Sequence, residues 1–314
     1  MGESGCGKST LGLALPRLLP ERDVEYSGRI WYKGVDILSL REEQLEKFRG
    51  TELAMIFQEP MTSLNPIYRV GEQVAEAFWV RNRRSEDYFE EQSHPKPKLA
   101  TGLLRQKQIT LRVGRRTLKE LIPKTRGILA DLQIPHPERV AEMYPHEFSG
   151  GMKQRIMIAM ALAGNPSFLI ADEPTTALDV TTQMQILSLL RDINHRLGMG
   201  ILLITHDLGV VAAIADYGLV MYGGKIIEEA PTAELFENPL HPYTVGLMNS
   251  FPTGHKDDMR LETIPGIVPP LGRFPSGCRF SPRCQHSFDK CRVIIPRPIQ
   301  VSENHKVSCF LYGE

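Results

Sequence analysis

Glycines, a lysine and two hydroxyl residues are spaced near the start of the chain in a way that suits phosphate binding. Residues Gly2 to Ser9 fit the pattern G-x-x-x-x-G-K-[ST], called a P-loop. In such a loop backbone N–H groups point into a phosphate-sized hollow, the lysine reaches the β- and γ-phosphates, and the hydroxyl takes one Mg²⁺ position. The residues predicted to bind a nucleotide here are Gly2, Glu3, Ser4, Gly5, Cys6, Gly7, Lys8, Ser9 and Thr10.

Two carboxylates follow an apolar stretch in the middle of the chain. Phe168 to Ala171 is predicted to be a buried strand, and it runs into Asp172 and Glu173, a Walker B pattern. Strands of this kind carry carboxylates to the edge of a sheet where nucleotides bind. We expect Asp172 to hold Mg²⁺ through water and Glu173 to orient or deprotonate the attacking water, a role that contributes about 10²–10⁴-fold.

The elements that must position these residues alternate between helix and strand. Buried strands are expected at 53–57, 168–171 and 201–204, and shorter strands around turns at Lys33-Gly34 and Gly223-Gly224. Helices are expected at 11–19 with a kink or early end at Pro16, and at 41–48, 70–80, 127–143 with a break at 134–137, 150–162, 182–197 and 208–215. This alternation predicts an α/β fold with a parallel sheet covered by helices on both faces.

Composition limits the functional classes. Lys plus Arg equals Asp plus Glu at 37 each, so no global charge favours nucleic acid. The sequence has no apolar run long enough for a membrane span and no signal peptide, which predicts a soluble, cytosolic protein.

Residues 81–126 differ from the rest, with 13 Lys or Arg against 5 Asp or Glu. His94-Pro-Lys-Pro-Lys98 cannot continue a helix, so we expect an insert with its own turn and two helices. A solvated surface insert is the simpler interpretation. The alternative is a basic face that meets lipid headgroups or a partner protein.

Further motifs carry a family resemblance. Phe148-Ser-Gly-Gly-Met-Lys-Gln154 resembles the signature motif of ATP-binding cassette (ABC) ATPases, with Ser149 predicted as the N-cap of the helix that follows. Gln58 resembles the Q-loop, Ala177-Leu-Asp179 the D-loop and His206 the H-loop of that family. Together with the P-loop and Walker B pattern, these motifs identify the chain as resembling an ABC ATPase, a P-loop (RecA-like) nucleotide-binding domain with an α-helical subdomain.

The resemblance implies a composite site shared by two subunits. Ser9, Gln58 and Asp172 would hold Mg²⁺, Glu173 would act as the base, and His206 would hold the γ-phosphate and the water. Ser149, Gly150 and Gly151 would serve the ATP of the partner subunit, with Asp179 of the D-loop beside them.

A second resemblance lies at the other end of the chain. Asn238-Pro-Leu-His-Pro-Tyr-Thr-Val-Gly-Leu247 and Gly277-Cys-Arg-Phe-Ser-Pro-Arg-Cys284 resemble the C-terminal extension of the ATPase subunits of oligopeptide and dipeptide importers, and Met61-Thr-Ser-Leu-Asn-Pro66 is also similar. This implies a second ATPase subunit, two transmembrane permeases, an extracytoplasmic substrate-binding protein and a peripheral place at the cytoplasmic face of the membrane. Peptide is the implied cargo, with nickel or sugar as alternatives.

Four cysteines gather in the last forty residues, namely Cys278, Cys284, Cys291 and Cys309. In the importer group the matching cysteines are associated with a four-iron four-sulfur cluster, which the resemblance therefore implies; zinc and free thiols are the alternatives. We expect Arg279, Arg283 and Arg292 to favour the thiolates, and we expect a tail with little core of its own.

These motifs divide the chain into an ABC ATPase domain at 1–237, with a helical subdomain at about 69–165, and an extension at 238–314. Relatives carry roughly thirty to forty residues before the P-loop, so we expect the natural start to lie upstream of Met1. The alternatives are a soluble ABC ATPase that acts on nucleic acid or the ribosome, and a truncated, catalytically impaired subunit.

Overall fold

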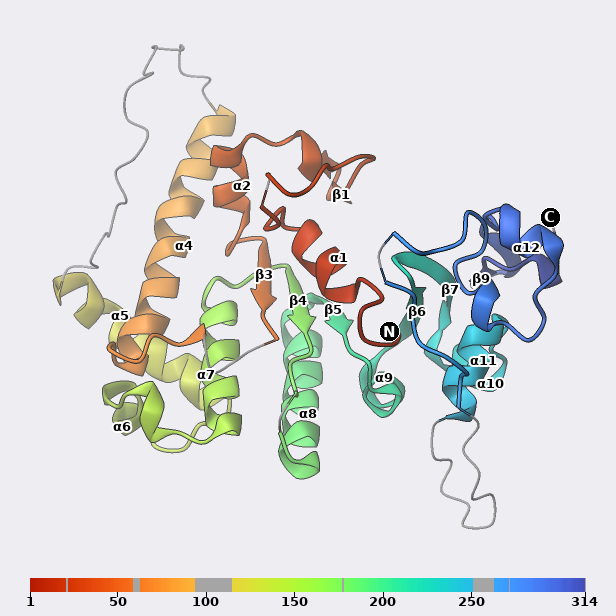
Figure 1. Ribbon diagram of the computed structural model, residues 1–314. Helices are drawn as coiled ribbons and strands as arrows, with labels where there is room; N and C mark the ends of the chain where they lie inside the picture. Colours follow the sequence, from red (N-terminus) through yellow and green to blue (C-terminus); the bar gives the residue numbers. More distant parts are fainter. Residues whose placement is uncertain are drawn as a thin grey trace. The chain divides into compact units, whose positions relative to one another are not determined.

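Residues 1–20, 22–58, 63–93, 115–176, 178–250, 263–270 and 272–313 are described by the computed structural model (Figure 1). They form two units. The P-loop unit joins Met1–Ala14 to Leu203–Glu314, and the carboxylate unit is Leu15–Leu202. Each candidate catalytic residue can therefore be assigned to one unit.

The carboxylate unit is built on short parallel strands with apolar sequences. β3 (Leu53–Ile56) pairs in parallel with β4 (Phe168–Asp172), and Ile56 lies opposite Ala171. β5 (Gly200–Ile204) follows β4 in the sheet order and crosses the boundary between the units. Because the strands are parallel, the residues after β3 and after β4 emerge at the same edge of the sheet.

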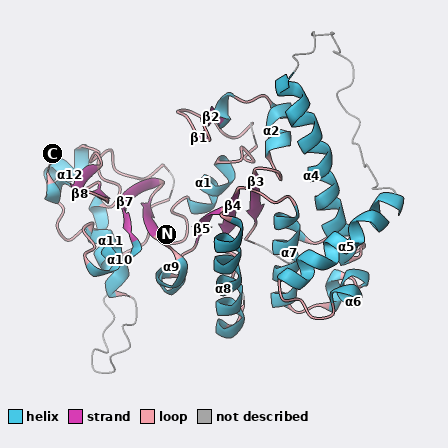
Figure 2. Cartoon of the chain, turned by 180° about the vertical axis from the view of Figure 1, so that it is seen from behind, coloured by secondary structure: helices cyan, strands magenta, loops and turns pink. Residues whose placement is uncertain are grey.

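Helices cover this sheet and form a subdomain of their own. α7 packs on β3 and on α8, while α4, α5 and α6 pack on one another, and both α4 and α5 contact α7 (Figure 2). The elements of this unit other than β3–β5 are β1 (Trp31–Tyr32), β2 (Val35–Asp36), a 3-10 helix (Ile37–Ser39), α2 (Glu42–Phe48), α4 (Val70–Ser93), α5 (Arg115–Asp131), α6 (Pro137–Glu142), a 3-10 helix (Pro145–Glu147), α7 (Gly150–Ala163) and α8 (Val180–Leu197).

The P-loop unit contains a four-stranded antiparallel sheet with the order β6-β7-β9-β8. Its core contains three aromatic rings in edge contact, from Tyr222, Tyr243 and Phe280. The elements of this unit are α1 (Lys8–Ala14), α9 (Leu208–Ile214), β6 (Tyr217–Tyr222), β7 (Lys225–Pro231), α10 (Thr232–Glu237), α11 (Pro242–Asn249), η3 (Ser281–Arg283), α12 (Asp289–Val293), β8 (Ile299–Ser302), β9 (His305–Val307) and a 3-10 helix (Phe310–Tyr312).

The tail therefore shares a core with β6 and β7, which agrees with the expectation that it has little core of its own. Phe280 is 3% exposed within this core. The carboxylate of Glu228 on β7 accepts hydrogen bonds from the backbone N–H groups of Leu240 and His241, and His305 on β9 contacts it at 2.8 Å. These buried polar contacts fix the tail to the sheet.

Most of the expected elements are confirmed, including the hairpins at Lys33-Gly34 and Gly223-Gly224. The first helix was expected at 11–19, but it begins at Lys8 and ends at Ala14, because Pro16 cannot continue it. The helix expected at 70–80 runs on to Ser93, so α4 enters the basic segment instead of ending before it. Residues 94–114 of that segment, including His94–Lys98, lie outside the described residues. Residues 115–126 belong to α5, so the helix expected to start at 127 begins earlier, at Arg115. No helix in the described part of the chain is long and apolar enough to cross a membrane.

Candidate phosphate-binding and carboxylate site

The P-loop curls around the amine of Lys8. Lys8 is 7% exposed, and its Nζ donates to the backbone carbonyls of Gly2 at 2.7 Å and Glu3 at 3.0 Å. The N–H of Cys6 bonds to the Glu3 carbonyl, and the Cys6 carbonyl accepts from the N–H of Gly224. The loop thus holds its cation in place through its own backbone, while Ser4, Gly5 and Thr10 stay exposed.

Glycine is required at Gly2 for two reasons. Its φ is +148°, and a Cβ built there would lie 2.3 Å from the Met221 carbonyl oxygen on β6. Gly5 has a φ of +79° but has open space around it. The sequence pattern therefore reports a close backbone approach at Gly2 and a left-handed turn at Gly5.

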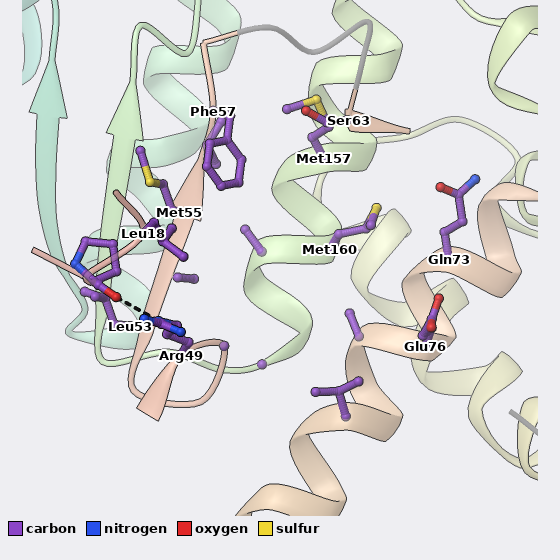
Figure 3. Close-up of a pocket in the computed structure, with 18 residues that line it drawn as sticks. Leu18, Arg49, Leu53, Met55, Phe57, Ser63, Gln73, Glu76, Met157 and Met160 are labelled. Carbon is purple, nitrogen blue, oxygen red and sulfur yellow. Dashed lines mark hydrogen bonds between the residues drawn. The ribbon is translucent and has the colours of Figure 1, made fainter. Parts of the chain in front are cut away.

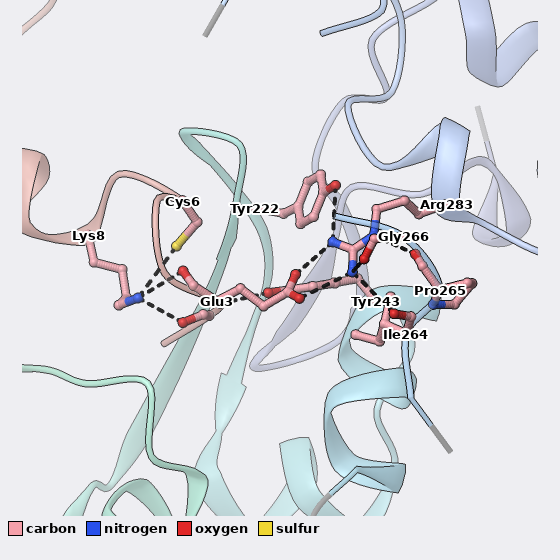
Figure 4. Close-up of polar contacts among 10 residues, drawn as sticks. Glu3, Cys6, Lys8, Tyr222, Tyr243, Ile264, Pro265, Gly266 and Arg283 are labelled. Carbon is pink, nitrogen blue, oxygen red and sulfur yellow. Dashed lines mark hydrogen bonds and ion pairs between the residues drawn. The ribbon is translucent and has the colours of Figure 1, made fainter. Parts of the chain in front are cut away.

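Glu3 is fastened by side chains from distant parts of the same unit (Figure 4). Its N–H donates to the Tyr243 hydroxyl at 2.8 Å, and its carboxylate accepts from both terminal nitrogens of Arg283 at 2.8 and 3.1 Å. Burial raises the pKa of the Tyr243 hydroxyl, so this group stays protonated at neutral pH.

A cavity of about 510 Å³ opens beside the loop within the P-loop unit. His206, which follows β5, lies on its wall together with Gly2, Glu3 and Ser4. The opposite lining comes from the tail, at Gly266, Ile267 and Val268. The structure thus brings His206 to the same cavity as the P-loop residues Gly2, Glu3 and Ser4.

In the carboxylate unit, Gln58 and Glu173 meet where β3 and β4 end. Gln58 Nε2 donates to Glu173 Oε2 at 3.1 Å, and the hydroxyl of Thr176 donates to the same oxygen at 3.0 Å. Glu173 has a φ of +46°, a left-handed conformation that costs energy in a residue other than glycine. Asp172, one residue earlier, is 4% exposed.

The signature residues lie at the start of α7. Ser149 is the N-cap by backbone geometry, as expected, yet its side chain makes no capping hydrogen bond. Ser149 and Gly150 are exposed, and a Cβ at Gly151 would lie 2.6 Å from Thr182 Cγ2. Close packing of α7 against α8 is therefore enough to require glycine at position 151, whether or not a ligand binds there.

Asp179 caps α8. Its carboxylate accepts from the Thr182 hydroxyl at 2.7 Å and from the Thr182 N–H at 2.9 Å, and these bonds lower the pKa of Asp179. Ala177, the first residue of the expected D-loop, lies outside the described residues, as do Met61 and Thr62.

The four tail cysteines line one small cavity of about 20 Å³, room for about one water molecule. Burial raises the pKa of the Cys309 thiol to about 11 and also raises those of Cys278 and Cys284. In the part of the chain that the structure describes, no group of three or more His, Cys, Asp or Glu residues is arranged to hold a metal ion. Four thiols on one cavity suit an iron–sulfur cluster in donor type, and the cavity as it stands would have to widen to hold one.

The expectation that neighbouring arginines favour the thiolates is wrong for two of them. Arg283 binds the Glu3 carboxylate, and Arg279 donates to the Gly223 carbonyl. Desolvation by burial is the largest cause of the raised cysteine pKa values.

Sequence reasoning missed three residues of the site. Thr176 stands three residues after Glu173, a spacing at which a hydroxyl can reach back, so a local signal existed. Tyr243 and Arg283 are 240 and 280 residues from Glu3 in sequence, and no local pattern could link them.

An apolar groove of about 440 Å³ lies between β3, α4 and α7, and Phe57 at the end of β3 is part of its lining (Figure 3). Its apolar lining includes Leu18, Met55, Phe57, Val80, Met157 and Met160. Phe57 is 44% exposed, so the groove presents apolar surface to solvent.

Comparisons with known proteins show the family of the chain. Residues 1–176 match the ABC transporter family, and residues 227–291 match the oligopeptide/dipeptide transporter C-terminal region. Relatives named as peptide import ATP-binding proteins include one from Brucella abortus, 43% identical over 327 residues, covering 100% of this chain and 87% of the relative. A peptide ABC transporter ATP-binding protein by name, from Sinorhizobium fredii, is 42% identical over 316 residues and covers 100% and 85%.

Solved structures give the same assignment of fold. A dimeric bacterial ABC transporter cassette is similar with a TM-score of 0.54 and 25% identity, covering 74% of this chain and 83% of that one. A component of the cbiONQ ABC transporter complex of Clostridium perfringens is similar with a TM-score of 0.54 and 26% identity, covering 76% and 78%. With an α/β fold, a P-loop and a family match over more than half its length, the chain belongs to the ABC transporter family of ATPases.

Proposed function

We propose that this chain hydrolyses ATP to power the import of di- and oligopeptides across the cytoplasmic membrane. The observation that carries this proposal is the match of residues 227–291 to the oligopeptide/dipeptide transporter C-terminal region, in a chain whose relatives are named for peptide import. The working assembly would contain a second ATPase subunit, two permeases and an extracytoplasmic substrate-binding protein. This chain would then lie peripherally at the cytoplasmic face.

The proposed roles follow from the geometry within each unit. Lys8 and the loop N–H groups would bind the phosphates, and His206 would contact the γ-phosphate from the wall of the same cavity. Glu173 would take a proton from the attacking water, with Gln58 and Thr176 holding its carboxylate in place.

Magnesium would be held by oxygen ligands, namely the Ser9 hydroxyl, the Asp172 carboxylate and the side-chain oxygen of Gln58. Gln58 fits because its nitrogen is used on Glu173, which leaves the amide oxygen as its ligand atom. The ion would neutralise charge that develops on the phosphates.

Ser149, Gly150 and Gly151 would bind the ATP of the partner ATPase across a dimer interface. The exposed N-cap of α7, with a serine hydroxyl that makes no capping bond, supports this role. Asp179 would lie at the same interface, where its helix cap fixes the D-loop backbone.

The Glu173→Gln variant tests the catalytic proposal. We expect it to keep ATP binding, to lose turnover by about 10²–10⁴-fold, and to trap a dimer that size-exclusion chromatography detects. An undiminished ATPase rate would contradict the assignment of Glu173 as the base.

The cargo is tested by uptake. A strain without this chain should lose uptake of labelled di- and oligopeptides, wild type should restore it, and Glu173→Gln should not. Normal peptide uptake together with loss of nickel or sugar uptake would replace the proposed cargo.

We propose that the permeases contact the apolar groove between β3, α4 and α7. Its two methionines from α7 can adapt to a partner surface, and its position beside β3 links the contact to the residue that bonds Glu173. Met160→Glu, at a half-buried residue of the groove lining, should abolish co-purification with the permeases while ATP binding stays intact. Met184→Glu is the matched control, since Met184 is 50% exposed on α8 outside the groove.

We also propose bounds for the domains of the chain. The ATPase domain is proposed to span 1–237, with a helical subdomain at about 69–165, and the importer extension to span 238–314.

The four cysteines of the extension are proposed to hold a four-iron four-sulfur cluster, supported by their convergence on one cavity. Binding would require this cavity to widen and the thiols to lose protons. Colourless, iron-free protein after anaerobic purification would overturn the cluster.

A further inference from the structure

Arg283 stands out because it is a buried cation that binds two other segments of the P-loop unit, the P-loop itself and residues 264–266. The residue is 8% exposed, and it lies at the end of η3 beside Cys284. Its two terminal nitrogens form a paired contact with the Glu3 carboxylate (Figure 4). A guanidinium that binds both oxygens of a carboxylate fixes the orientation of that carboxylate as well as its position.

The same guanidinium also holds the tail segment that faces the P-loop. Its Nε donates to the Pro265 carbonyl at 2.8 Å, and Nη2 donates to the carbonyls of Gly266 at 3.2 Å and Ile264 at 3.4 Å. Tyr222 lies on its remaining side, with its ring 5.8 Å from the guanidinium carbon.

These contacts join two walls of one cavity. Glu3 and Gly266 both line the 510 Å³ cavity that His206 also lines. Arg283 donates to the carboxylate of the first and to the backbone carbonyl of the second. Glu3 is itself an x residue of the phosphate-binding pattern, and its carbonyl accepts from Lys8. A shift of Glu3 would therefore move a carbonyl that positions the phosphate-binding amine.

We propose that Arg283 is a positioning residue for the P-loop, acting through Glu3, so that the tail sets the geometry in which the nucleotide phosphates bind. This inference rests on the proposed ATP site at the P-loop. The tail extension thereby becomes part of the nucleotide-binding machinery.

Binding measurements on the purified full chain test this role. Isothermal titration of ATP and of ADP should give a dissociation constant raised roughly tenfold in Glu3→Gln and in Arg283→Gln, because both nucleotides carry the β-phosphate that the loop cradles. If the two side chains act as one unit, the double variant should bind about as weakly as either single variant. Arg283→Lys keeps the charge but loses the paired geometry, so it should recover part of the affinity.

Lys306→Gln is the matched control. It breaks another ion pair of the tail, with Glu229 on β7, that does not reach the P-loop. Its nucleotide affinity should equal that of wild type. Thermal unfolding without nucleotide separates folding from positioning. Glu3→Gln keeps the carbonyl contacts of Arg283 but leaves this buried cation without its carboxylate, so it should melt below wild type, and affinities are compared at a temperature at which every variant is folded.

The outcomes separate two failures. If wild type binds neither ATP nor ADP, the proposed function fails. If wild type binds both and the folded Glu3→Gln variant binds them equally well, or if the effects of the two single variants simply add, the positioning role of Arg283 is overturned.

Discussion

In the P-loop unit, Lys8 is buried and bonded to loop carbonyls, and the loop is held by Tyr243, Arg283 and the β6–β7 hairpin. In the carboxylate unit, Glu173 is half-buried in a left-handed conformation and accepts hydrogen bonds from two exposed side chains, Gln58 and Thr176. The first arrangement is held by buried contacts from several segments, whereas the second depends on hydrogen bonds from exposed side chains. Changes in the P-loop unit should therefore affect binding, and changes in the carboxylate unit should affect rate.

The largest expected effect is a loss of stability caused by a substitution in the core of the P-loop unit. Phe280→Ala should lower the free energy of unfolding by about 3–5 kcal/mol, because the ring is 3% exposed and contacts Tyr222 and Tyr243. Urea unfolding followed by fluorescence measures this. Phe57→Ala, at a ring that is 44% exposed in the other unit, should cost far less. Equal losses would show that the buried aromatic cluster contributes no more to stability than a half-exposed ring.

The next effect concerns the loop backbone. Gly2→Ala should weaken ATP binding by roughly 10–100-fold, because it adds a clash with the Met221 carbonyl to a positive φ. Gly5→Ala shares the positive φ but meets no atom within 4 Å, so its loss of affinity should be smaller. Titration calorimetry with ATP compares them, and the reverse order of losses would refute the close approach at Gly2.

A smaller effect is expected in the carboxylate unit. Thr176→Val removes one hydrogen bond from Glu173 and should slow turnover by roughly 3–10-fold, the equivalent of about 0.5–1.5 kcal/mol, with nucleotide affinity unchanged. Steady-state hydrolysis and equilibrium binding separate the two quantities. A loss of affinity in place of rate would break the proposed division of labour.

The smallest effect is a dependence on pH at Asp179. The bonds from Thr182 lower its pKa below the ordinary value of 3.8, so the folded state prefers the ionised form. The resulting stabilisation is complete above pH 3.8 and disappears as pH falls through the lowered pKa. Asp179→Asn should therefore melt slightly below wild type at pH 6, and the gap should close in strong acid. A gap that stays constant with pH would exclude ionisation as the cause.

Local signals in the sequence were sufficient for much of the site. The glycine spacing predicted the P-loop, and the apolar runs predicted that Gln58 and Glu173 follow buried strands. The parallel pairing of β3 with β4 then brings these two side chains within hydrogen-bond distance. Helix ends were less well predicted, since proline set the end of α1 but nothing local marked the continuation of α4 to Ser93.

Contacts between distant segments could not be predicted in this way. Periodicity reports which face of an element is buried but not which partner covers it. The arginines near the cysteines were interpreted by their neighbours in sequence, whereas Arg283 points to Glu3, 280 residues away. The left-handed conformation of Glu173 was equally invisible, because glutamate carries no sequence signal for a positive φ.

The long separation between Glu3 and Arg283 also has a consequence for biosynthesis. The P-loop is translated long before Arg283, the partner of its Glu3 carboxylate, and before the Phe280 ring, which appear only after more than 270 further residues have been made. Contacts with such large separations form late, since the chain between them must be ordered or looped out first. The P-loop therefore cannot form its contacts with the tail until the tail has been synthesised. Ribosome-bound intermediates that end before residue 283 should not hold Glu3 in its final place.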